Sequence, residues 1–345
     1  MTRFRQILPF ALFPVVVVGA QAVMRATQTE YCLTQLTMAV YYAIVVMGLC
    51  LLMGYAGQVS LGHGAFFAIG GYTSAVLTTH NFSAFKASAW AAWLQWAHLL
   101  VAKPDLYGNA AMTVSPWAAF LAAMAVTFLI AVLIGYPALR LRGHYLAMAT
   151  LGLGIVISIV LKNEAVYTGG PDGMSVPPMS FSGWEISGER QWYWLFACVL
   201  LFSVWACLNL IDSPFGRALR ALHGSEVASQ GVGVDVARYK VAIFVLSAFF
   251  ASIMGSLTAH YVGFVTPDTA EFSHSIELVT MVVVGGMASV YGSVIGAVLL
   301  TALPQALTTF EGWETVAFGT ILMLSMIFLP NGLVPTLAAR FRGGR

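Results

Sequence analysis

Residues 213–261 read SPFGRALRALHGSEVASQGVGVDVARYKVAIFVLSAFFASIMGSLTAHY and join a charged segment directly to a long apolar run. Six charged residues lie between Arg217 and Lys240, in a chain of 345 residues that has only 16 Lys and Arg and 14 Asp and Glu. Residues 241–262 carry none of these four residue types. They are long enough to cross a bilayer, which takes about 20 apolar residues. The stretch therefore predicts a polar segment at the membrane surface followed by a spanning helix.

The composition of the whole chain is that of a membrane protein. Hydrophobic residues make up 59% of it and charged residues 9%, whereas soluble domains carry about 25% charged residues. We therefore expect an all-α polytopic membrane protein that is surrounded by the lipid bilayer and has no soluble domain. The net charge of +2 gives no indication of a nucleic-acid partner. The four cysteines lie in apolar runs without CxxC spacing, so we expect buried thiols and no metal site.

Apolar runs of sufficient length predict about ten transmembrane helices, or about eight if the two Gly-rich stretches are re-entrant. Basic residues flank both termini, lie at Arg140 and Arg142, and recur between Arg217 and Lys240. An even number of spans places all of these flanks, and both termini, in the cytoplasm. The first run also fits a signal peptide, although we expect an uncleaved helix. The expected spans are 7–24, two within 31–85, 117–139, 145–161, 192–210, 241–262, two within 278–310, and 316–334.

Three polar segments are expected to connect these spans outside the membrane. Residues 212–240 form the cytoplasmic loop, and residues 80–115 and 163–190 form extracytoplasmic loops. Trp90, Trp93 and Trp96 favour an interfacial helix within the first extracytoplasmic loop. The second is rich in Gly, Pro and Ser and lacks helical periodicity.

Two Gly-rich stretches interrupt the apolar runs, at residues 54–77 and 282–300. Broken helices that line a translocation path would need such glycines, and so would close helix packing, and the two interpretations are compatible. His63 fits a role along the path or a structural histidine that is bonded to a helix carbonyl. The candidate path residues are Tyr55, Gly57, Gln58, Ser60, Gly62, His63, Gly285 and Gly286.

Sequence motifs for catalysis and for ATP binding are missing from the chain. It contains no HExxH, GxSxG or GxxxxGKS/T pattern, so we expect no catalytic residues and no P-loop. Ion-coupled transport would need carboxylates at mid-membrane depth, but Glu164, Glu185, Glu271 and Glu277 are placed in loops or at span ends. Transport would then be passive, or it would be driven by a separate ATPase subunit.

Residues 214–229 predict a short amphipathic helix on the cytoplasmic side. Ser213 is placed as its N-cap and Pro214 in its first turn, and Gly231 and Gly233 end it. Phe215, Leu219 and Leu222 share one face. Such a helix can dock into a soluble partner or lie on the lipid surface as a connector.

The segment FGRALRALHGSEVASQGVGVDVARYKVAIFVLSAFFASIMGSL resembles the cytoplasmic loop and following helix of ABC-transporter permeases of the branched-chain amino acid (LivH/LivM) family. GYAGQVSLGHGAFFAIGGYTSA and VVVGGMASVYGSVIGAVLLTALPQAL are similar to Gly-rich stretches of the same family, in the same order. Ser229 departs from the family pattern, which has a second small alanine there. The matching positions, which the resemblance assigns to ATPase coupling, are Gly216, Arg217, Ala218, Arg220, Ala221, Glu226, Ala228 and Gly233.

The resemblance implies that residues 1–345 form a single transmembrane permease domain in a bacterial inner membrane. It further implies a second homologous permease chain in a heterodimer, a periplasmic binding protein that delivers substrate, and ATPase subunits that carry ATP and Mg. This chain itself would bind no cofactor. The helix around Arg217 and Glu226 would transmit ATPase closure, with Glu226 paired to basic groups of the ATPase. Branched-chain or other amino acids are the expected substrates, with urea or short amides as the alternative. A passive channel and a membrane enzyme are the competing classes.

Overall fold

The computed structural model describes residues 31–81, 100–104, 110–138, 144–181, 184–307 and 332–336, with a few single positions outside these ranges. The chain divides into two compact units that alternate along the sequence. Unit 1 comprises residues 1–58, 188–243 and 277–345, and unit 2 comprises residues 59–187 and 244–276. Two helices, α11 (Val236–Val262) and α12 (Phe272–Gly285), therefore begin in one unit and end in the other.

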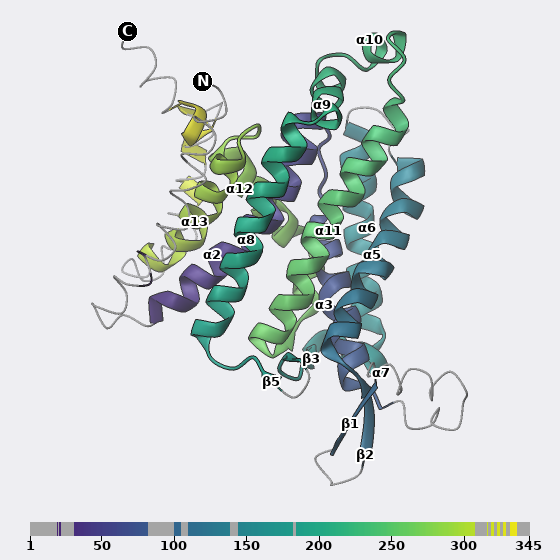
Figure 1. Cartoon of the computed structure of the whole chain (residues 1–345), viewed down its shortest axis with the longest axis vertical. Helices are drawn as coiled ribbons and strands as arrows, with labels where there is room; N and C mark the ends of the chain where they lie inside the picture. The colour runs from purple at the N-terminus through teal and green to yellow at the C-terminus, as the bar shows by residue number, and fades with distance from the viewer. Residues whose placement is uncertain are drawn as a thin grey trace. The chain divides into compact units, whose positions relative to one another are not determined.

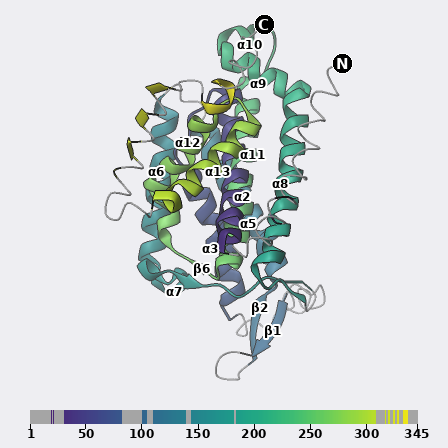
Figure 2. The ribbon, with the colours of Figure 1, turned by 90° about the vertical axis from the view of Figure 1, so that its left-hand side faces the viewer.

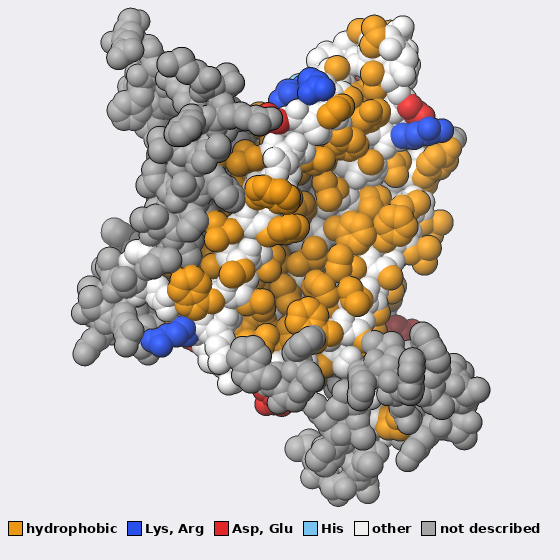
Figure 3. Space-filling view, in the orientation of Figure 1, with side chains coloured by type: hydrophobic (Ala, Val, Ile, Leu, Met, Phe, Trp, Pro, Cys, Tyr) orange, Lys and Arg blue, Asp and Glu red, His pale blue; other side chains and the backbone are white. Residues whose placement is uncertain are grey.

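Unit 1 is built around α2 (Tyr31–Cys50), which packs against α8 (Glu189–Asp212) and α13 (Val290–Leu307) (Figure 1). Leu33 of α2 is buried against Tyr193 and Ala197 of α8. The chain continues from α2 into a π-helical turn, η1 (Leu51–Tyr55), and from α8 into α9 (Pro214–Gly224) and α10 (Glu226–Gly231). Hydrophobic side chains cover most of α8 in Figure 3, and its charged residues lie in its first and last turns.

Unit 2 is built around α3 (His63–Thr79), which packs against α5 (Pro116–Ala138) and α6 (His144–Asn163). Short elements close one end of it: α7 (Ala165–Thr168), η3 (Gly170–Asp172) and η4 (Pro267–Ala270), with strand β3 (Met174–Ser175) paired to β6 (Phe264–Val265). Figure 2 shows a hairpin of β1 (Leu100–Pro104) and β2 (Ala110–Val114) projecting beyond the ends of α3 and α5. A second small hairpin joins β4 (Ser180–Phe181) to β5 (Trp184–Glu185).

The helical positions confirm several expected spans. Among the described residues five helices are long and apolar enough to cross a membrane: 33–55, 116–138, 145–163, 189–212 and 236–262. α11 begins at Val236 rather than Val241, because Arg238, Tyr239 and Lys240 lie on its first turns. The expected interruption within 278–310 is confirmed by the turn between α12 and α13, although α12 begins earlier, at Phe272. The total number of spans and the side of the termini stay predictions.

The β-hairpin of residues 100–114 was not expected from the sequence. The predicted interfacial helix around Trp90, Trp93 and Trp96 lies outside the described residues, as do most of the predicted span 7–24 and part of 316–334. Among the described residues of 163–190, the two short helical turns α7 and η3 and short strands are in line with the lack of periodicity.

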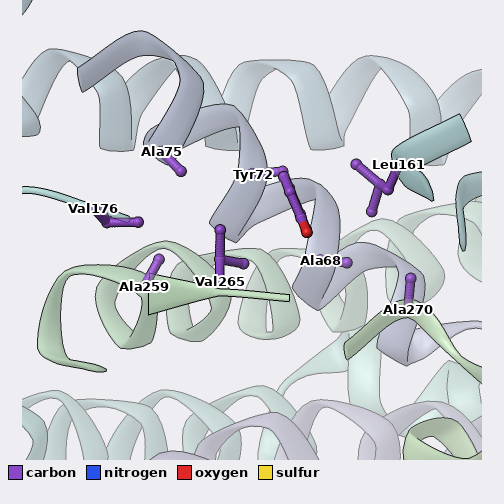
Figure 4. Close-up of a cluster of buried hydrophobic side chains, with 8 residues drawn as sticks. All are labelled: Ala68, Tyr72, Ala75, Leu161, Val176, Ala259, Val265 and Ala270. Carbon is purple, nitrogen blue, oxygen red and sulfur yellow. The ribbon is translucent and has the colours of Figure 1, made fainter. Parts of the chain in front are cut away.

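Close backbone contact holds α3 and α11 together in unit 2. A Cβ atom at Gly255 would lie 1.9 Å from the carbonyl oxygen of Phe67, and one at Gly70 would lie 2.3 Å from that of Ser252. Small and medium side chains complete the core on this side (Figure 4), with Tyr72 of α3 next to Leu161 of α6 and Ala270 of η4. Lipid-embedded helices associate through such packing, because lipid provides little hydrophobic drive. Close packing is thus one role of the first Gly-rich stretch.

We expect Gly255→Ala to destabilise the protein by about 1–3 kcal/mol, because the added carbon must displace backbone atoms of α3. The thermal unfolding midpoint in detergent measures the effect. Gly152→Ala in α6 is the matched control, since a Cβ there has no atom within 4 Å. Equal midpoints for the two variants would contradict the close contact.

Candidate functional site

The first part of the polar segment after α8 forms the helix start that its sequence predicts. The hydroxyl of Ser213 accepts a hydrogen bond from the amide of Gly216 at 3.3 Å, which makes Ser213 the N-cap of α9, and Pro214 occupies the first turn. Gly216, Leu219 and Leu222 are the buried residues of α9. Phe215 packs on Tyr239 of α11 with ring centroids 5.1 Å apart. The amphipathic character predicted for this helix is therefore confirmed.

The expectation of one continuous helix over residues 214–229 is wrong. α9 ends at Gly224, and Ser225 has an extended backbone whose hydroxyl accepts from the amide of Ala228 at 3.2 Å. Ser225 therefore caps a second helix, α10, because a serine hydroxyl satisfies a first-turn amide better than it serves a helix interior. α10 ends at Gly231, and Gly233 follows with a left-handed φ of 85°.

Basic and apolar side chains stand exposed along these two helices. Arg217 and Arg220 are exposed on α9, and Arg217 also donates to the carbonyl oxygen of Asp212 at 3.0 Å. Val227 of α10 is 70% exposed and Val232, just after it, is 79% exposed. We call these four residues the α9–α10 surface. Figures 1 and 2 show both helices beyond the same end of α8. Ala218 is half-buried and Ala228 is exposed, and their short side chains do not cover the neighbouring arginines and valines.

An ion pair fixes α10 against α11. The ammonium of Lys240, whose side chain is only 4% exposed, donates to the carboxylate of Glu226 at 2.5 Å, and the Glu226 side chain is 35% exposed. Burying an ammonium without a partner is costly, so Lys240 requires this carboxylate. Glu226 is thus bonded within unit 1, and its expected pairing with a basic group of an ATPase stays a prediction.

We expect Glu226→Gln to destabilise the protein by about 1–3 kcal/mol, because it leaves the Lys240 ammonium buried without its counter-charge. The double variant Glu226→Lys with Lys240→Glu should recover part of the loss. Arg238→Gln is the control: its pair with Asp235 is exposed on both sides, at 87% and 48%, and is worth about 0–1 kcal/mol. Thermal unfolding checks all three, and no difference between Glu226→Gln and Arg238→Gln would argue against a structural ion pair.

Each Gly-rich stretch contains a helix break, at residues 57–62 and 286–289, and the start of the first break lies near the second within unit 1. η1 ends at Tyr55, and Gly57 has a left-handed φ of 66°. The Tyr55 hydroxyl donates to the carbonyl oxygen of Ala288 at 2.9 Å, and the Cys50 thiol donates to that of Met287 at 3.1 Å. Both carbonyls lie in the turn between α12 and α13, next to Gly285 and Gly286. The structure therefore brings Tyr55 and Gly286 into one region, with Gly57 and Gln58 immediately after Tyr55.

His63 is buried in unit 2, between two serine hydroxyls. Its Nδ1 lies 3.1 Å from the hydroxyl oxygen of Ser60 and its Nε2 lies 2.6 Å from that of Ser247. The expected carbonyl partner is wrong, because α11 presents a serine to the ring. The first-turn amide of Gly64 donates to Ser275 at 3.2 Å, so protein groups already occupy part of this helix end.

The sequence analysis did not predict the contacts of Thr150 in unit 2. The amide of Leu61 donates to Thr150 Oγ1 at 3.0 Å, and a Cβ at Gly62 would lie 2.5 Å from the carbonyl oxygen of Thr150. The available signal was a hydroxyl residue inside an apolar span, which must find a hydrogen-bond partner in lipid. In the described part of the chain no three His, Cys, Asp or Glu side chains are grouped to hold a metal ion.

Residues 31–330 match the family model described as the permease component of the branched-chain amino acid transport system. The chain belongs to this permease family. It is 32% identical over 323 residues to the LivM permease protein of the high-affinity branched-chain amino acid transport system of Salmonella typhimurium, covering 87% of this chain and 69% of that protein. The LivM protein of Escherichia coli gives the same values.

A more distant relative is another permease protein of a branched-chain amino acid transport system. The LivH permease protein of Escherichia coli is 23% identical over 313 residues, which is 86% of this chain and 92% of that protein. No solved structure matches the chain. Family membership confirms the resemblance drawn from the three sequence segments, and it fits the apolar helices of a multi-pass membrane transport protein.

Proposed function

We propose that the chain is the membrane-spanning permease subunit of an ATP-driven importer for branched-chain or other amino acids. The observation that carries the proposal is the α9–α10 surface, which offers exposed arginines and valines on two short, capped helices. Exposed apolar side chains beside cations suit a protein partner with an apolar pocket and acidic groups around it. A separate ATPase subunit, with its own ATP and Mg, is the proposed occupant.

The structure offers a route from this surface into the membrane. The Ser213 hydroxyl joins the end of α8 to the start of α9, since it also donates to the carbonyl oxygen of Leu210 at 2.6 Å. The Lys240–Glu226 pair joins α10 to α11. α11 then continues without interruption as far as Val262. A movement of the ATPase would thus be passed to two spanning helices at once, which suits rocking of one bundle against another.

The remaining parts of the proposal follow the relatives. A periplasmic binding protein delivers the amino acid, a second homologous permease chain completes a heterodimeric pathway, and the complex lies in the bacterial inner membrane. One first-turn donor of α3, the amide of Gly64, is already bonded to Ser275 in this conformation. We therefore assign the main substrate selection to the binding protein. Calorimetry of that protein with leucine and with urea distinguishes the amino-acid proposal from its urea and amide alternative.

Reconstitution in liposomes together with an ATPase subunit, a second permease chain and a binding protein tests the proposal. We expect amino-acid uptake only when ATP is supplied on the side of the membrane where the ATPase is bound. Val227→Asp should weaken ATPase binding at least about tenfold, because it would bury an unpaired carboxylate at the interface. Affinity of the purified subunits is the measurement.

Val166→Asp in α7 is the matched control, because Val166 is 78% exposed and lies in unit 2, outside the α9–α10 surface. It should leave ATPase binding unchanged. Uptake that proceeds equally without ATP would favour a passive channel, and unchanged binding with Val227→Asp would reject the docking role of α10.

A further inference from the structure

The turn between α12 and α13 is closed by side chains from another helix. In a continuous helix, the carbonyl oxygens of Met287 and Ala288 would accept from amides four residues later. Here the thiol of Cys50 and the hydroxyl of Tyr55 donate to them. A Cβ at Gly54 would lie only 1.5 Å from the Met287 oxygen, so the two backbones are in direct contact.

These bonds matter because a helix break frees backbone carbonyl groups from their usual amide partners. Each such group needs another donor, and the two side chains supply it. The π-helical geometry of η1 adds a residue to the turn. Gly54 can thus touch the opposite backbone while Tyr55 reaches Ala288. The two breaks of unit 1 therefore depend on each other for their polar groups.

The same region also touches α9. A Cβ at Gly57 would lie 2.9 Å from Nδ1 of His223, so the last residues of α9 rest on the backbone that follows η1. Within unit 1, contacts thus run from α9 through Gly57 and Tyr55 to Ala288 at the start of α13. α9 carries two arginines of the α9–α10 surface.

We propose that Tyr55 is a positioning residue for transport: its bond to Ala288 makes the turn before α13 follow the movement of α9. This inference rests on the proposed function, since the movement of α9 is that imposed by the ATPase. Cys50 supports the same connection through Met287. The bond transmits the movement; it is not needed for the ATPase to bind or for ATP to be hydrolysed.

Tyr55→Phe removes the donor and keeps the ring. In the reconstituted importer we expect ATPase binding and basal ATP hydrolysis to match the wild type. The number of amino acids transported per ATP should fall by about fivefold, which corresponds to the loss of a hydrogen bond of about 1 kcal/mol. Cys50→Ala should lower the ratio as well, and Cys50→Ser, which retains a donor, should restore it.

Tyr291→Phe is the matched control. Tyr291 lies on α13, and its buried hydroxyl has no hydrogen-bond partner among the described residues, so the same change of atoms breaks no bond. Its transport ratio should equal that of the wild type.

Hydrogen–deuterium exchange gives a second readout that does not need transport. ATPase binding should change exchange at residues 286–292 in the wild type, and Tyr55→Phe should abolish that change. An unchanged transport ratio and exchange response in Tyr55→Phe would overturn the inference. A variant that loses ATPase binding together with thermal stability would do so too, since the bond would then serve folding. A wild-type complex without ATP-driven uptake rejects the proposed function alone, because the exchange response still decides the role of Tyr55.

Discussion

The interior of a membrane provides no hydrogen-bond partner, and this constraint explains much of the fold. Backbone polar groups that the chain places there must be bonded by the chain itself, and several side chains are bonded within the chain in the same way. His63 is held between two serine hydroxyls, and the hydroxyl of Thr127 on α5 donates to Ser252 on α11 at 2.8 Å. The glycines act beside these bonds, because they bring backbones close enough for short side chains to reach. Helix breaks are tolerated for the same reason, since side chains replace the amides that the break removes.

The segment that holds α9 and α10 is stabilised by a different set of interactions. There α9 and α10 are set by caps at Ser213 and Ser225 and by one ion pair whose cation is buried. On the outer side of these helices, Arg217 donates to the carbonyl oxygen of Asp212, and Val227 is exposed. This division leaves the arginines and valines available to a partner, while Lys240 and Glu226 hold the helices in position.

The sequence alone predicted much of the fold, because composition and local spacing encode it. The spans at α5, α6, α8 and α11, the Ser213 cap and the breaks at both Gly-rich stretches depend on neighbouring residues. The separation of α9 from α10 was missed, since Ser225 can sit inside a helix as well as before one. The β1–β2 hairpin was missed because the nearby tryptophans indicated an interfacial helix more strongly than any turn residues indicated a hairpin. The bonds of Cys50 and Tyr55 to Met287 and Ala288 join residues more than 200 positions apart, and nothing local indicates them.

The alternation of the two units along the chain has a consequence for biosynthesis. The last segment of unit 2, residues 244–276, is synthesised before α13. In unit 1, by contrast, α2 and η1 are synthesised early, and their partner carbonyls lie in the much later turn at Met287. During synthesis, Cys50 and Tyr55 therefore have no partner carbonyls until all of unit 2 has been made. Unit 1 is the part of the protein that closes last, around a helix that was inserted early.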